Sequence, residues 1–239
     1  MMKIKLLLVF VLMFETVVFS QSDKQLDELF EKVKANYLDH QEVAFDMEFF
    51  VFKHLDGKYI ESEHYDAYLY SNPQMNYFET TVITSLTVQG KTLFVDKENK
   101  KMYLTPVSNE LQLGFRGEEL QKTFDQFEKK EVKDLGKHYE IHLSELKNKL
   151  MSDYNEISYV IQKNTYKILS QEIYYPSKPS YDVTKGNTSY KIKIIYKELD
   201  VSKQDAPTLD TYILKDLSSN NYEVTSGYRS FTLINQLNK

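Results

Sequence analysis

The sequence predicts a mainly β protein of the α+β class, in which helices cover the apolar face of one large curved antiparallel sheet. Three observations carry this prediction. Most of the chain alternates between apolar and polar residues, the turns between these stretches are short, and only two segments have a helical period. Two helices among nine or so strands are too few for alternating β–α units, but they are enough to cover one face of a sheet.

The first 20 residues have the order of a secretory signal peptide. Lysines precede a short apolar run at residues 6–14, and Ser20 provides a small residue for cleavage. The run is too short to span a bilayer. The chain has no cysteine, so neither a disulfide nor a lipid attached at cysteine is possible. We therefore expect an exported, soluble protein whose mature chain begins at Gln21.

Charge and length narrow the classes of function. The formal net charge is −5, and acidic and basic residues alternate along the chain, which argues against a nucleic-acid partner. Arg116 and Arg229 are the two arginines among 30 basic residues, so an arginine-lined phosphate site is not expected. Residues 21–239 have the length of one sizeable domain.

The first elements are a helix and a hairpin. Ser22 or Asp23 caps an amphipathic helix of about four turns. A strand with strict alternation follows, and the Asp56-Gly57 turn leads to a return strand at residues 59–70. The apolar stripe of the helix consists of Leu26, Leu29, Phe30, Val33 and Tyr37, and one face of the strand consists of Val43, Phe45, Met47, Phe49 and Val51.

The rest of the chain continues the sheet, with one helical interruption at residues 117–130. That segment places Leu120, Phe124 and Phe127 on one side of the expected helix. Residues 176–187 read as a long exposed loop. The strands are expected within residues 75–89, 91–106, 131–143, 156–162, 166–176 and 189–200, and residues 201–239 form an extension that ends in a strand or short helix at 228–237.

The stretch "GKHYEIHL" at residues 136–143 raises the question of a metal site. In a strand, His138, Glu140 and His142 point from one face and could hold zinc. However, Tyr139, Ile141 and neighbouring apolar residues occupy the opposite face, so the three polar residues are expected on the solvent side. We expect no metal ligands here.

No other pattern in the sequence indicates catalysis. There is no G-x-S-x-G elbow, phosphate loop or dinucleotide fingerprint, and the absence of cysteine excludes thiol chemistry. We therefore expect no catalytic residue and no cofactor. The 19 tyrosines and 14 phenylalanines are the notable excess, and they suit core and cross-strand pairs. A broad aromatic and aliphatic face closed by two helices would also suit acyl chains.

The hairpin at residues 85–106 resembles that of the periplasmic lipoprotein carriers, the LolA-like family (LolA and LolB). Gly90 and Lys91 are among its matching residues, with Gln89 in place of an acid and Phe94 in place of a tryptophan. Similarity in layout extends over about residues 22–200. The other matches are Val88, Thr92 and Leu93 in the hairpin, Pro73 before it, and the closing strands with a Gly186-Asn187 turn.

This resemblance implies an incomplete antiparallel barrel with lid helices over an apolar cavity, in a monomer of the periplasm. Its cargo would be the acyl chains of lipoproteins or another lipid, and envelope membrane proteins are possible partners. The tail beyond Val201 and the loop at 176–187 depart from the family, and neither arginine can be assigned a role in holding the lid. An alternative is an envelope interaction or assembly protein on the same scaffold. The candidate lipid-binding residues are Val43, Phe45, Met47, Phe49, Val51, Leu120, Phe124 and Phe127.

Overall fold

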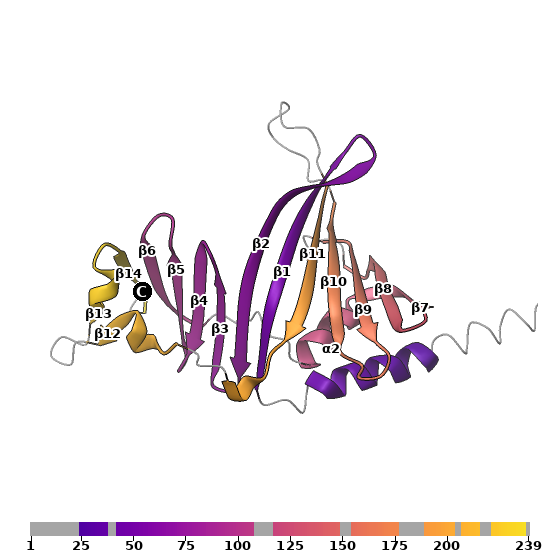
Figure 1. The fold of residues 1–239 in the computed structure, drawn as a ribbon, viewed down its shortest axis with the longest axis horizontal. Coiled ribbons are helices and arrows are strands. Elements are labelled where there is room, and N and C mark those ends of the chain that lie inside the picture. The colour runs from indigo at the N-terminus through magenta and orange to yellow at the C-terminus, as the bar shows by residue number, and fades with distance from the viewer. Residues whose placement is uncertain are drawn as a thin grey trace, which may run out of the picture. The chain divides into compact units, whose positions relative to one another are not determined.

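The structure is a computed structural model that describes residues 24–37, 42–107, 117–148, 154–176, 189–203, 207–215 and 221–237. Within these residues the fold is mainly β, an unclosed, curved antiparallel sheet with two α-helices, as the sequence predicts (Figure 1). The expected signal peptide and the expected loop at 177–187 lie outside the described residues. No helix in the described part of the chain has the length and apolarity needed to cross a bilayer.

Twelve strands are hydrogen-bonded in the order β14-β6-β5-β4-β3-β2-β1-β11-β10-β9-β8-β7, and β12 and β13 form a separate pair. One pairing differs from the expected antiparallel pattern, because β14 runs parallel to β6. The strands are β1 (Val43–Leu55), β2 (Lys58–Asn72), β3 (Met75–Thr80), β4 (Ile83–Val88), β5 (Lys91–Asp96), β6 (Lys101–Pro106), β7 (Phe127–Asp134), β8 (His138–Leu146), β9 (Glu156–Gln162), β10 (Ile168–Tyr175), β11 (Tyr190–Glu198), β12 (Ile213–Lys215), β13 (Tyr222–Val224) and β14 (Thr232–Asn235).

The chain divides into two compact units, each made from two separated stretches. The first unit contains Met1–Asp39 and Arg116–Lys191, and the second contains His40–Phe115 and Ile192–Lys239. The N-terminal helix therefore shares a unit with β7 to β10, and the C-terminal tail shares a unit with β1 to β6. The single domain expected over residues 21–239 stays a prediction.

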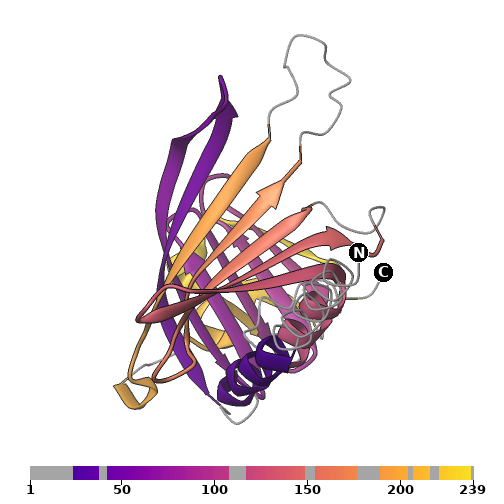
Figure 2. The same ribbon diagram turned by 90° about the vertical axis from the view of Figure 1, so that its right-hand side faces the viewer.

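In the first unit, the N-terminal helix (residues 24–37) and α2 (Gly117–Asp125) lie side by side (Figure 2). All five residues of the expected apolar stripe of the N-terminal helix are buried. Phe30 stacks on Phe124 of α2 with 3.8 Å between ring centroids, and the hydroxyl of Tyr37 accepts a hydrogen bond from the backbone N–H of Ile168 at 2.8 Å. These contacts attach both helices to the β9–β10 end of their own unit.

The second helix is shorter than the sequence predicts. It ends at Asp125, and Phe127 begins β7 instead of sharing a helix face with Leu120 and Phe124. Residues 131–134 lie within the strand expected at 131–143, but residues 127–130 are predicted as helix because the sequence of β7, FEKKEVKD, is highly charged and lacks apolar alternation. Since β7 is the last strand in the sheet order, charged side chains at this edge also hinder pairing with other chains. Phe127 is nevertheless fully buried.

The second unit begins as a meander of hairpins from β1 to β6. The turns Asp56-Gly57 and Gln89-Gly90 both have two consecutive residues with positive φ, near 50° and 75°. Such turns match the right-handed twist of paired strands, and glycine takes the second position without steric cost. The expected hairpins at both places are confirmed, including the one that resembles the lipoprotein carriers.

The sheet of the second unit is apolar on both faces. The expected face of β1 carries Val43, Phe45 and Met47, which are buried, but Ala44 on the opposite face is buried as well. Starting at Ala44, each residue on that second face is paired with a residue on the same face of the next strand, from β1 to β6. They join the C-terminal tail in a core cluster made of Ala44, Tyr70, Tyr77, Leu86, Leu93, Val95, Met102, Leu104, Tyr212 and Ile213.

A polar network fixes the tail over this core cluster. Tyr77 donates a hydrogen bond to Glu79 at 2.6 Å, and its hydroxyl lies 3.3 Å from that of Tyr212. Lys97 donates to the other oxygen of Glu79 at 2.7 Å. Burial alone would raise the pKa of Glu79, but the hydrogen bonds from Lys97 and Tyr77 and the charge of Lys97 outweigh it and hold the pKa below its usual value.

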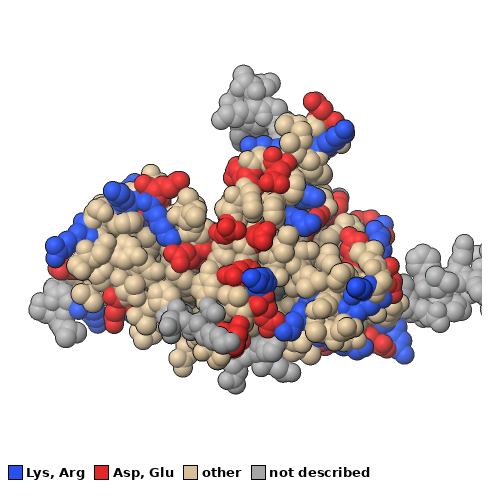
Figure 3. All heavy atoms as spheres, viewed as in Figure 1, with Lys and Arg blue, Asp and Glu red and all other residues tan. Residues whose placement is uncertain are grey.

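On the surface seen in Figure 3, acidic and basic side chains are interspersed, and they do not gather into a large area of one sign. Such a mixture suits a protein of modest net charge. The expectation that the protein has no nucleic-acid partner stays a prediction.

Replacing Ile213 tests the packing of the tail. Ile213 is 1% exposed, whereas its neighbour Leu214 is 52% exposed. Ile213→Ala is expected to lower the free energy of unfolding by about 2–4 kcal/mol, because it leaves a cavity in the core cluster. Leu214→Ala is expected to change it by less than about 0.5 kcal/mol. Urea denaturation measures both values, and an Ile213→Ala protein as stable as the parent would contradict the described core.

The pH dependence of stability tests the Glu79 network. Because the pKa of Glu79 is lower in the folded state, its carboxylate stabilises the fold above the ordinary glutamate pKa. That contribution is lost as the pH falls through the lowered pKa. Denaturation from pH 7 into the acid range should therefore show a smaller acid loss of stability for Glu79→Gln than for the parent. Parallel pH profiles for the two proteins would refute this role of Glu79.

Candidate functional site

The expected lipid-binding face of β1 changes from buried to accessible along the strand. Val43, Phe45 and Met47 are buried, while Phe49 and Val51 are half-buried. The register places residues of the neighbouring strands on the same face, so this side of the second unit forms a continuous surface. We call it the odd face of the unit, because it carries the odd-numbered residues of β1.

The odd face also contains aromatic side chains that sequence reasoning did not assign to a site. Phe49 stacks on Tyr65 with 5.3 Å between centroids and meets Phe78 edge-on at 6.2 Å. Phe78 lies opposite Ser85, and Ser85 lies opposite Phe94, so Phe94 belongs to the same face. The ring centroids of Phe94 and Tyr103 are 6.3 Å apart. All four added aromatic residues are half-buried. The alternation within β5 and β6 could have found Phe94 and Tyr103.

The remaining candidate residues lie in the first unit. Phe124 is buried between the stacked ring of Phe30 and the ammonium of Lys130, whose Nζ lies 4.0 Å from the ring centroid. Phe127 is part of the core of that unit, and Leu120 is half-buried. Because these residues and β1 belong to different units, the expected lid over β1 stays a prediction.

The polar side of β8 forms hydrogen bonds within the sheet. His142 places Nδ1 2.8 Å from the hydroxyl of Ser158, and its Nε2 lies 3.7 Å from a carboxylate oxygen of Glu156. His138 lies opposite Gln162. Within the described ranges, no group of three or more His, Asp or Glu residues could hold a metal ion. The absence of a metal role for His138 and His142 stays a prediction.

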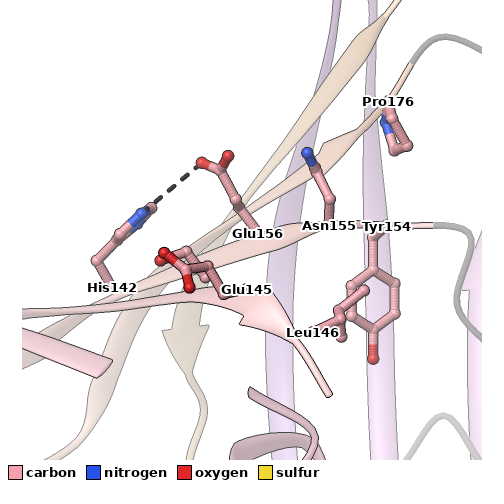
Figure 4. A pocket seen from close by; sticks show the side chains of 8 residues that line it. His142, Glu145, Leu146, Tyr154, Asn155, Glu156 and Pro176 are labelled. Carbon is pink, nitrogen blue, oxygen red and sulfur yellow. Dashed lines mark ion pairs between the residues drawn. The ribbon is translucent and has the colours of Figure 1, made fainter. Parts of the chain in front are cut away.

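A pocket of about 530 Å³ opens beside His142 in the first unit (Figure 4). Its volume is within the range typical of small-molecule sites, roughly 300–1,000 Å³. The end of β8, the start of β9 and the residue after β10 form its walls. The lining residues are His142, Ser144, Glu145, Leu146, Tyr154, Asn155, Glu156 and Pro176.

A hydrolase triad links a serine to a histidine and the histidine to an acid, and Ser158, His142 and Glu156 are linked in this way. Their geometry nevertheless differs from that of a triad. Ser158 is 7% exposed and is not among the residues that line the pocket. The 3.7 Å separation between His142 and Glu156 is also longer than a hydrogen bond. A nucleophile must reach the atom it attacks, so this group does not provide one to the pocket.

Comparison with known proteins finds similarity in structure only. No family model matches the chain, and no curated protein sequence matches it. An uncharacterized conserved protein from Thermus thermophilus is 10% identical, with a TM-score of 0.39, over 88% of this chain and 98% of that one. A LolA superfamily protein from Nitrosomonas europaea is 10% identical, with a TM-score of 0.31, over 76% and 94%.

A third solved structure is a putative outer membrane lipoprotein-sorting protein domain from Vibrio parahaemolyticus. It is 11% identical to this chain, with a TM-score of 0.32, and the match covers 73% of this chain and 93% of that one.

Single replacements of the two histidines test the assignment of β8. His142→Ala should lower the free energy of unfolding by about 1–3 kcal/mol, because it leaves the buried hydroxyl of Ser158 without its partner. His138→Ala should change it by less than about 0.5 kcal/mol. Metal analysis of the parent and both variants should show no stoichiometric zinc. Zinc in the parent that is absent from either variant would reverse the assignment.

Proposed function

We propose that the protein is a non-enzymatic carrier that binds the acyl chains of lipoproteins or of another lipid in the periplasm. One observation carries the proposal: the odd face of the second unit offers an accessible aromatic and aliphatic surface. This surface begins at the buried end of β1 and continues through Phe49 and Val51 to the rings of Phe78 and Phe94. The resemblance of the β4–β5 hairpin to the lipoprotein carriers supports the same function.

The second unit is stabilised without a ligand on the odd face. Its core cluster lies on the opposite face, where the tail already buries residues such as Leu86 and Leu104. The aromatic residues of the odd face can therefore exchange water for an apolar ligand without loss of the core. Each methylene group of an acyl chain that is buried there contributes about 0.8 kcal/mol.

The two helices of the first unit are the proposed lid. The stack of Phe30 on Phe124 is an apolar contact between the two helices. At the surface, the N-terminal helix also forms polar contacts with the turn between β9 and β10, such as the hydrogen bond from Asn36 to the carbonyl oxygen of Thr165. Exposed polar contacts contribute little to stability and can break while the helices stay folded. Because the apolar stripe of the N-terminal helix is buried, a lid that opens to admit a chain has to expose part of that stripe.

A second candidate function, an envelope interaction or assembly protein, is favoured by the tip of the β1–β2 hairpin. Leu55 and Ile60 are 47% and 51% exposed there, and Tyr59 is also exposed. Exposed apolar side chains gathered at one place are typical of contact surfaces. In this alternative the tip binds another envelope protein and the odd face carries no cargo.

Binding of a fluorescent acyl probe tests the carrier function. The delipidated protein should bind the probe saturably at micromolar concentration. Phe124→Ala should weaken binding about tenfold or more, since it removes a ring from the proposed lid and one lost aromatic contact is worth about 1.4 kcal/mol or more. Fluorescence titration measures the affinity, and thermal unfolding measures the accompanying loss of stability.

Leu104→Ala is the matched control, because Leu104 is buried in the core cluster on the opposite face from the proposed site. It should destabilise the protein without changing the affinity for the probe. If the delipidated parent shows no saturable binding, the carrier function fails and the interaction function replaces it.

Export is tested by the N-terminus of the protein from its own cells. The protein recovered from the soluble periplasmic fraction should begin at or near Gln21, because the apolar run before it is too short to remain as an anchor. N-terminal sequencing and mass spectrometry check this outcome. An exported protein that retains Met1, or one that needs detergent for extraction, would contradict it.

A further inference from the structure

On the odd face, the register of the second unit places one row of paired side chains across five strands. The row consists, from β2 to β6, of Leu69, Phe78, Ser85, Phe94 and Tyr103. Because neighbouring strands lie about 4.8 Å apart, the row runs across the sheet for roughly 19 Å. Leu69 is 3% exposed, whereas the four residues from Phe78 to Tyr103 are half-buried. We call these four residues the accessible row.

In β5 and β6 the accessible row is one apolar residue wide. Every second residue of a strand shares a face, so the neighbours of Phe94 and Tyr103 on the odd face are two residues away along each strand. All of them are polar, namely Thr92, Asp96, Lys101 and Thr105. The hydroxyl of Thr92 lies 3.0 Å from that of Thr87, and Thr105 donates to the carbonyl oxygen of Thr92 at 3.4 Å. An apolar strip of this width fits one acyl chain, and not several side by side.

The β6 end of the accessible row carries two donors without partners. Within the described residues, the hydroxyl of Tyr103 forms no hydrogen bond, and the exposed ammonium of Lys101 forms neither a hydrogen bond nor an ion pair. Asp96 lies opposite Lys101, but Asn99 donates hydrogen bonds to both carboxylate oxygens of Asp96, at 2.9 and 2.8 Å. The positive charge of Lys101 and the hydroxyl of Tyr103 therefore lie on one face, roughly 7 Å apart along the strand, and suit an anion.

We propose that the accessible row binds a single acyl chain whose anionic headgroup, a carboxylate or a phosphate monoester, lies at Lys101 and Tyr103. The inference rests on the proposed carrier function and narrows the cargo to a single-chain acidic lipid. The tail lies toward β2, where the row becomes buried. Ser85 is the small residue between two phenylalanines, so methylene groups have room between the rings. The acceptor oxygens of the headgroup match the two donors of β6.

Two variants at the headgroup end test the proposal in calorimetric titrations of the delipidated full-length protein. Lys101→Gln and Tyr103→Phe should each weaken binding of decanoate about threefold or more, the size of one ion pair or hydrogen bond near a surface. Neither variant should change the binding of decanol, which has the same chain without the charge. Both should keep the melting temperature of the parent, because neither group has a partner among the described residues.

Lys91→Gln is the matched control for the loss of one positive charge. Lys91 precedes Thr92 on β5 and therefore lies on the opposite face of the sheet. This variant should bind decanoate like the parent. If it weakens binding as much as Lys101→Gln does, the effect of Lys101 reflects net charge and the proposed headgroup site is wrong.

The path and number of the chains are tested separately. Phe94→Ala should weaken binding of decanoate and decanol alike, about fivefold or more, because the methylene groups lose an apolar contact. Didecanoyl phosphatidic acid, which carries a phosphate monoester on two chains, should displace decanoate less effectively than decyl phosphate does. Tighter binding of decyl phosphate than of decanoate assigns the site to a phosphate monoester, and the reverse order assigns it to a fatty acid.

Four results would overturn the proposal. They are decanoate binding by Lys101→Gln or Tyr103→Phe that equals the parent's, an equal loss of decanol binding in these variants, unchanged binding by Phe94→Ala, and displacement by the two-chain lipid that matches decyl phosphate. The fluorescent acyl probe keeps this outcome distinct from the carrier function. If the parent still binds the probe saturably, the carrier function stands without the acidic headgroup site; if it binds neither the probe nor decanoate, both proposals fail.

Discussion

The packing of the C-terminal tail on the second face of the sheet determines much of the remaining structure. Because Tyr212 and Ile213 join the residues that extend from Ala44 to Leu104, the unit has a complete core on that side. Its other face is buried at Val43, Phe45 and Met47 and becomes more accessible at Phe49 and Val51. An antiparallel sheet usually has one dry and one wet face. Here the tail provides the dry face, and the odd face can remain accessible and still be aromatic.

The parts of the fold that were predictable are those where a local pattern and the final packing agree. The stripe from Leu26 to Tyr37 is buried as a helical period requires, and the glycine turns at Gly57 and Gly90 lie where the hairpins need positive φ. The start of β7, at residues 127–130, could not be predicted in the same way. Its charged sequence suits a strand at the edge of a sheet. Its position there follows from pairing with β8 and not from any apolar periodicity of its own.

The candidate site was predictable only in part, for a similar reason. Val43, Phe45 and Met47 can be assigned to one face from alternation alone, but the contribution of Phe78 and Tyr103 depends on the register of several strands. The pocket beside His142 depends on three strand ends that are distant in sequence. Its unusual feature, an amide oxygen at Asn155 without a hydrogen-bond partner among the described residues, exists only once those ends are assembled. The alternation of His138 and His142 in the sequence predicts that they share a face of β8, but it does not predict this pocket.

The parallel pairing of β14 with β6 has a consequence for how the chain folds. The last described strand, β14, pairs with β6, which belongs to the first half of the sequence. Along the chain, these two strands are separated by the second stretch of the first unit. Contacts between such distant residues raise the contact order and slow folding. The second unit cannot be completed until β14 has been synthesised. A chain with this topology therefore leaves the core cluster incomplete until the tail that carries Tyr212 and Ile213 has been synthesised.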